Sequence, residues 1–107
     1  MELLPKSIAK TLPLLYATEE VPLQDKVVHL KLFTPWTNWT WYAVEFDPER
    51  RLFWGLVSGH ETEWGYFSLD ELEEICGPLG LRIERDISFC AQKVKDMIEA
   101  EHLTGVI

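Results

Sequence analysis

The strongest β-forming pattern lies in the middle of the chain. Tryptophan, threonine, tyrosine and valine crowd residues 39–46, and the apolar run LFWGLVS fills residues 52–58. Between them, Asp47 and Pro48 favour a turn, because proline presets φ and the preceding aspartate can hydrogen-bond its own backbone. The pattern predicts two antiparallel strands joined by a turn at residues 47–51.

Both faces of this predicted hairpin are apolar. If Phe46 pairs with Leu52, one face carries Tyr42, Val44, Phe46, Leu52, Trp54 and Leu56, and the other carries Trp39, Trp41, Ala43, Phe53, Gly55 and Val57. A sheet with one solvated face would instead alternate apolar and polar residues. We therefore expect both faces to be covered, and any aromatic surface left exposed to mark an interface.

Weaker patterns predict the remaining elements. Further strands are expected at residues 26–33, 64–67 and 81–89, and helices at residues 6–15, 69–76 and 92–102. This order predicts one α+β domain over residues 1–107, with a largely antiparallel sheet of four to five strands and two to three short helices.

The central helix carries the clearest end signals. Ser68 and Glu71 have the spacing of a capping box, in which the Ser68 hydroxyl accepts from the Glu71 amide and Glu71 reaches back to the cap. Gly77 is expected to supply a left-handed cap, and Pro78 prevents continuation. Within the helix, leucines 69 and 72 and isoleucine 75 are expected to face the core.

Length and composition agree with this domain. The chain has 107 residues, of which 47% are hydrophobic and 26% charged, and this usage excludes intrinsic disorder. No run approaches the roughly 18 apolar residues that cross a membrane. The start of the chain lacks an export signal. We therefore expect a cytoplasmic protein in which Cys76 and Cys90 are reduced, buried and inert.

Charge is distributed unevenly. The net charge is −8, and residues 45–74 hold nine acidic and two basic residues. Such a negative field repels phosphate backbones, so we expect no direct binding to nucleic acid and none to membranes. A basic protein partner or simple solubility accounts better for the excess.

Six acidic residues form the predicted acidic face: Glu61, Glu63, Asp70, Glu71, Glu73 and Glu74. Asp70 and Glu71 are also explained by the positive end of the helix dipole. The face is therefore either a solvated helix surface or a docking surface for a basic protein.

Four aromatic residues form a predicted aromatic face: Trp36, Trp39, Trp41 and Phe53. Core packing and a protein interface both suit such residues, and the interface could join two copies in a homodimer. A third possibility is that Trp36 and Trp39 stack on bases of a single strand or on sugars.

His60, Glu61 and Glu63 are the nearest approach to a catalytic or metal-binding cluster. Imidazole and carboxylate suit a divalent transition ion, so the alternative function is a small metal-dependent hydrolase. No second ligand motif, nucleophile elbow or phosphate loop accompanies them. We expect no catalytic residue, metal or cofactor.

Several motifs resemble a known bacterial family. They are Phe33-Thr34-Pro35, Thr40-Trp41-Tyr42-Ala43, Glu45-Phe46-Asp47, Phe53-Trp54-Gly55-Leu56-Val57, Gly59-His60-Glu61, Glu63-Trp64-Gly65-Tyr66-Phe67-Ser68 and the segment 77–86. Over residues 3–89 the chain resembles the family catalogued as domain of unknown function twenty-nine fifty-eight, and residues 90–107 look less like it.

The resemblance implies a protein often carried by plasmids, phages and integrative elements, with no agreed activity. It therefore transfers no catalytic residue. It implies an accessory role such as regulation or defence evasion, by association alone. Together these inferences predict a non-enzymatic, acidic protein-interaction module.

Overall fold

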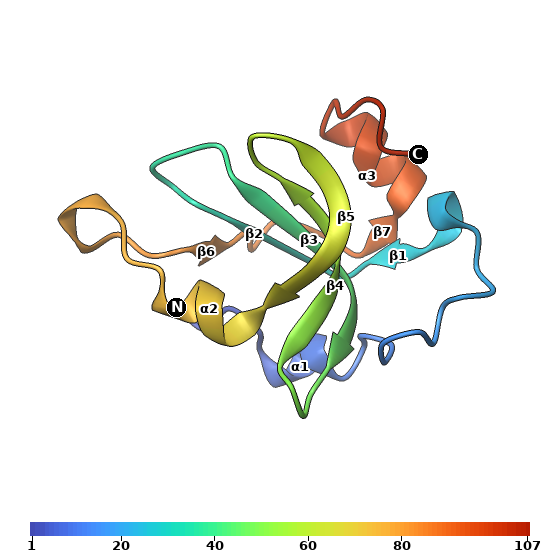
Figure 1. Ribbon diagram of the computed structural model, residues 1–107, viewed down its shortest axis with the longest axis horizontal. Helices are drawn as coiled ribbons and strands as arrows, with labels where there is room; N and C mark the ends of the chain where they lie inside the picture. The colour runs from blue at the N-terminus through green and yellow to red at the C-terminus, as the bar shows by residue number, and fades with distance from the viewer.

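A five-stranded antiparallel sheet lies at the centre of the computed structural model, which describes residues 1–107 (Figure 1). Its strand order is β5-β4-β3-β2-β6. The strands are β2 (Leu30–Phe33), β3 (Thr40–Asp47), β4 (Leu52–Ser58), β5 (Thr62–Ser68) and β6 (Glu84–Arg85). The predicted hairpin is confirmed as β3 and β4, which pair along almost their whole length.

Short elements surround this sheet. A second, two-stranded sheet joins β1 to β7, and three helices complete the fold. The bounds are β1 (Val27–Val28), β7 (Gln92–Lys93), α1 (Lys6–Ala9), α2 (Leu69–Glu74) and α3 (Val94–Ala100), with 3-10 turns η1 (Leu23–Asp25) and η2 (Pro78–Gly80). The predicted α+β class is confirmed.

A β-bulge at Val44 changes the register of the hairpin. Phe46 pairs with Phe53, not with Leu52, because the register shifts by one residue between Ala43 and Glu45. An extra residue inverts the alternation of side chains beyond it. Phe46 therefore lies on the opposite face from the one that we predicted.

The chain covers both faces of the sheet, each with its own core. The first core holds Leu3, Leu12, Leu30, Leu32, Trp41, Ala43, Phe46, Phe53, Phe67, Leu69, Leu72 and Ile83. The second core holds Val28, Tyr42, Val44, Leu56, Val94, Met97 and Val106. The N-terminal segment and α2 close the first core, and α3 with the C-terminal segment closes the second (Figure 1).

Two predicted elements near the N-terminus differ from the structure. The helix expected at residues 6–15 ends at Ala9, and the chain then runs beside β3, where the Pro13 carbonyl accepts the Phe46 N–H at 2.9 Å. The strand expected at residues 26–33 divides at His29, because β1 pairs with β7 whereas β2 pairs with β3.

Two predicted elements near the C-terminus also differ. The strand expected at residues 81–89 pairs with β2 only at Glu84 and Arg85. It ends there because the Asp86 carboxylate accepts the N–H and the hydroxyl of Ser88, which turns the chain and leaves Ile87 77% exposed. The helix expected at residues 92–102 begins at Val94, because residues 92–93 pair with β1.

The ends of α2 are confirmed at the start and corrected at the finish. The Ser68 hydroxyl accepts the Glu71 N–H at 3.2 Å, as predicted. The helix ends at Glu74, which leaves Ile75 exposed. Gly77 is extended, with φ −92, and is no left-handed cap. A Cβ at position 77 would lie 2.6 Å from the Trp36 ring, so the glycine there lets this ring pack close to the backbone.

Both cysteines are free and exposed, so the prediction that they are buried was wrong. Cys76 lies just beyond α2, and Cys90 lies in the loop before β7. Neither cysteine belongs to either core.

The two glycines that face each other across β4 and β5 make a testable pair. A Cβ at Gly55 would overlap the Tyr42 carbonyl, whereas a Cβ at Gly65 meets no atom within 4 Å. We expect Gly55→Ala to lower the free energy of unfolding by about 1–3 kcal/mol or more. Gly65→Ala should leave it unchanged or raise it by up to about 1 kcal/mol. Urea denaturation compares them, and equal midpoints would contradict this packing.

Candidate protein-interaction site

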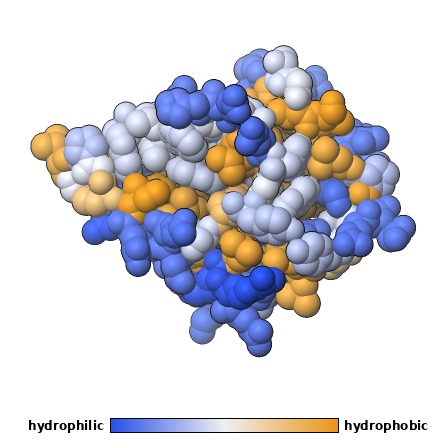
Figure 2. Space-filling view, viewed as in Figure 1, coloured by the Kyte–Doolittle hydropathy of each residue, from blue (hydrophilic) through white to orange (hydrophobic).

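The six predicted acidic residues fall into two groups at opposite ends of β5. Glu61 and Glu63, the acidic turn, lie where β4 passes into β5. The acidic helix is α2, with Asp70, Glu71, Glu73 and Glu74. The two groups lie near opposite ends of β5, whose seven residues span about 20 Å. In Figure 2 the surface over β5 is pale, with hydrophilic surface over the turn at the top and over α2 at the lower left.

Arg51 pairs with two of the four carboxylates of the acidic helix. Its Nε lies 2.7 Å from Asp70 Oδ1 and its Nη2 lies 2.6 Å from Glu73 Oε1. These carboxylates raise the pKa of Arg51 above its usual value, mainly through the hydrogen bond to Asp70. Glu71 and Glu74 are exposed and have no cation within ion-pair distance.

The acidic turn has no neutralising partner. Neither Glu61 nor Glu63 forms an ion pair, and both are exposed. The Glu61 carboxyl raises the pKa of Glu63, first through a hydrogen bond to its protonated form and then through charge repulsion. At neutral pH the turn therefore holds two charges that repel each other.

Trp39 brings one predicted aromatic residue to the acidic turn. Its ring lies over Gly59 and meets the His60 ring edge-on, with centroids 5.5 Å apart at 83°. Trp39, Val57, His60, Glu61 and Glu63 line a hollow of about 320 Å³, which we call the Trp39 hollow. An indole face beside carboxylates is a favourable setting for a cationic side chain.

The other predicted aromatic residues do not share this site. Trp41 and Phe53 are 7% and 0% exposed and belong to the first core. Trp36 is half-buried against the same core, with its ring over Gly77. Trp39 also packs against the first core, beside Trp41, but it alone of the four adjoins the acidic residues.

His60, Glu61 and Glu63 line one hollow but do not converge on one point. The structure contains no group of three or more His, Cys, Asp or Glu side chains close enough to hold a metal ion. The proposed hydrolase cluster thus exists as three neighbours around a turn.

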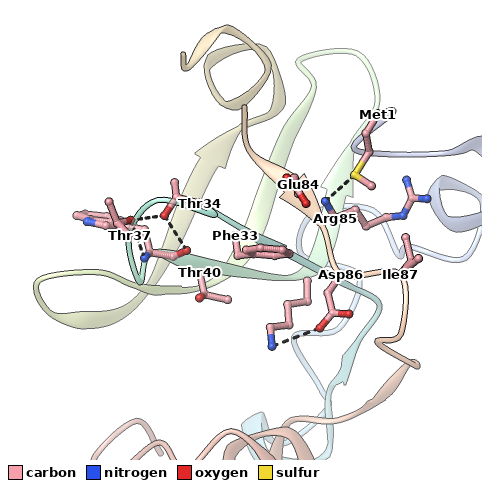
Figure 3. A pocket seen from close by; sticks show the side chains of 11 residues that line it. Met1, Phe33, Thr34, Thr37, Thr40, Glu84, Arg85, Asp86 and Ile87 are labelled. Carbon is pink, nitrogen blue, oxygen red and sulfur yellow. Dashed lines mark hydrogen bonds and ion pairs between the residues drawn. The ribbon is translucent and has the colours of Figure 1, made fainter. Parts of the chain in front are cut away.

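A second hollow, of about 470 Å³, lies between the end of β2 and β6. Figure 3 shows Phe33 in its middle, with three threonines on one side and the segment 84–87 on the other. Lys31 Nζ is held by Asp86 at 3.5 Å and Glu101 at 2.6 Å, and Arg85 donates to the Glu2 carbonyl. Both cations of this groove are therefore engaged within the chain.

Sequence reasoning missed this groove because its two walls are about fifty residues apart and meet only when β6 pairs with β2. The pKa of Asp86 is lowered, chiefly by the Ser88 hydroxyl bond and also by Lys31. Burial and the hydrogen bond to Glu101, at 2.7 Å, raise the pKa of Tyr42. Lys31 and Asp86, which line the groove, are therefore connected through Glu101 to Tyr42 outside it.

A family model described as "Protein of unknown function (DUF2958)" matches residues 3–107. The chain belongs to this family. The match includes residues 90–107, which we had expected to look less like the family, so α3 and its part of the second core lie within the DUF2958 match. No curated protein and no solved structure matches the chain.

Glu45 of this DUF2958 protein is a buried carboxylate that sequence reasoning also missed. It is 5% exposed and accepts the N–H of Tyr16 at 2.9 Å, the N–H of Thr18 at 3.2 Å and the Thr18 hydroxyl. Tyr16 has a left-handed φ of 69. Glu45 thus fixes the loop after α1.

None of the helices of this DUF2958 protein has the length and apolar character of a membrane-spanning helix.

The raised pKa of Glu63 predicts that replacing this carboxyl stabilises the protein at neutral pH but not in acid. Because the folded state raises the pKa of Glu63, it disfavours the charged carboxylate, and this penalty acts above that pKa and disappears as pH falls through it. We expect Glu63→Gln to raise Tm at about pH 7 and to leave it unchanged near pH 3, where carboxyls are protonated.

Asp47 provides the control of opposite sign. The Arg50 side chain lowers the pKa of Asp47, so its charged form stabilises the fold, and that contribution is lost as pH falls through the lowered pKa. Asp47→Asn should lower Tm near neutral pH and have less effect in acid. Thermal melts across the pH range measure both, and a Glu63→Gln protein that melts lower at neutral pH would contradict the account.

Proposed function

We propose that this DUF2958 protein is a non-enzymatic interaction module that binds a basic segment of another protein. The observation that carries this proposal is the set of carboxylates that the chain leaves unpaired at both ends of β5: Glu61, Glu63, Glu71 and Glu74. Cations on a partner would relieve the repulsion in the acidic turn and would also steer the encounter.

The Trp39 hollow supports the same function. It offers an aromatic face and two carboxylates to one lysine or arginine side chain. The same negative field disfavours nucleic acid as the direct ligand. We further propose a cytoplasmic accessory role in regulation or defence evasion for a plasmid, phage or integrative element, which rests on the family resemblance.

The alternative is a metal-dependent hydrolase that uses His60, Glu61 and Glu63. It has less support, because these side chains do not form a metal-binding group. Stoichiometric metal in the purified protein, together with a lower Tm after chelation, would favour it over the interaction module.

A charge-reversal experiment tests the interaction module. Fluorescence anisotropy would measure the affinity for a labelled lysine- and arginine-rich peptide at low and physiological salt. We expect Glu61→Lys with Glu63→Lys to weaken binding by about tenfold, since each exposed ion pair contributes up to about 1 kcal/mol. Neither carboxylate has an ion pair to lose, so the fold should persist.

Glu20→Lys with Glu99→Lys is the matched control. Both residues are exposed and lie outside the acidic turn and the acidic helix, and the change in net charge is the same. We expect this variant to bind within about threefold of the unaltered protein. Equal losses in the two variants, or binding that ignores salt, would contradict docking at β5.

A further inference from the structure

β5 is an edge strand with an unpaired side. Its only strand partner is β4. The Gly59 N–H donates to the Glu61 carbonyl and the Leu69 N–H to the Arg51 carbonyl, each at 2.9 Å. The first bond lies beside the pair Ser58–Thr62, and the second lies beside the pair Leu52–Ser68. Hydrogen-bonded and non-hydrogen-bonded pairs alternate along an antiparallel ladder, so both of these pairs are non-hydrogen-bonded.

The ladder alternation then fixes the direction of every backbone group in β5. Residues in non-hydrogen-bonded pairs direct their N–H and C=O groups away from β4. In β5 these residues are Thr62, Trp64 and Tyr66, whereas Ser68, the next in the series, is the N-cap of α2 and directs its C=O into that helix. A row of unpaired donors and acceptors therefore runs along the outer side of β5.

Apart from the charge of Glu63 near its start, this edge lacks the features by which proteins protect edge strands. Such edges are usually very short, bulged, or marked by lysine or proline. The opposite edge of the sheet, β6, is two residues long. β5 has seven residues, pairs without a register shift and contains neither lysine nor proline, and Tyr66 within it is 50% exposed.

Gly65 lies at the centre of β5, where its own N–H and C=O face β4. Glycine weakens a strand, and within a strand it often marks a close approach of another backbone or a ligand. No atom of this chain lies within 4 Å of the position of a Cβ at Gly65, so internal packing does not require the glycine. Gly55 opposite it is required, because the Tyr42 carbonyl fills that space.

We infer that β5 binds an extended, basic peptide segment of a partner as a sixth strand of the sheet. The inference rests on the proposed function and specifies its binding mode. Backbone hydrogen bonds to the outer side of β5 supply affinity, as in other cases of strand addition. The acidic turn and the acidic helix contact cations at the two ends, about 20 Å or six to seven residues apart.

A second copy of this chain is a poorer occupant of the edge. Acidic residues lie at both ends of β5, with Glu61 and Glu63 at one end and Asp70 and Glu71 at the other. Parallel or antiparallel pairing of two β5 strands would therefore bring acidic ends together, and like charges opposite each other destabilise paired strands. A basic peptide reverses the sign of this interaction.

Backbone methylation of a peptide probe tests the inference on the unaltered protein. The probe is a nine-residue peptide, KRVTVTVKR, with blocked ends. One methylated version carries N-methyl groups on its two threonines, and the other carries one N-methyl group on the valine between them. An added strand directs only alternate N–H groups to its neighbour. One methylated version should therefore bind about tenfold or more weakly, while the other should bind within about twofold of the parent.

The outcomes separate this inference from the proposed function. Salt-sensitive binding with the expected alternation supports both. Salt-sensitive binding that both methylated versions retain, or both lose equally, overturns strand addition and leaves the interaction module standing. No binding by the parent peptide at about millimolar concentration overturns the module and strand addition together. Concentration-dependent dimerisation that the peptide does not disrupt assigns the edge to a second copy and overturns the inference.

Discussion

The fold depends on one constraint: both faces of the β3–β4 hairpin are apolar, so both must be covered by a short chain. The bulge at Val44 divides the side chains between two cores, moving Phe46 to the first and keeping Val44 in the second. The N-terminal segment and α2 cover one face, and α3 with the C-terminal segment covers the other. The chain thus uses its helices on the faces of the sheet and leaves one side of β5 unpaired.

Electrostatics act on this same edge. Arg51, with a left-handed φ of 51, binds Asp70 and Glu73 and so joins the β3–β4 turn to α2. No cation serves Glu61 and Glu63 in the same way, and the Glu61 carboxyl raises the pKa of Glu63. A basic strand beside β5 would meet carboxylates at both of its ends.

The sequence predicted the features that depend on local patterns. The hairpin, its two apolar faces and the Ser68 cap follow from alternation, turn residues and spacing. Features that depend on distant contacts escaped prediction. Nothing around Val44 marks a bulge, and the role of Gly77 is evident only when Trp36 packs on it. The strand expected at residues 64–67 already separated Glu63 from Asp70, but its full length and its unpaired side became evident only in the structure.

Amide hydrogen exchange along β5 tests most directly whether this edge is open. Amides that face β4 are hydrogen-bonded, and amides on an uncovered edge are open to solvent. In the free protein, the amides of Trp64 and Tyr66 should exchange rapidly, while those of the alternate residues Glu63, Gly65 and Phe67 should be protected. Uniform protection of all five amides in dilute protein would show that the edge is already covered and would contradict the account.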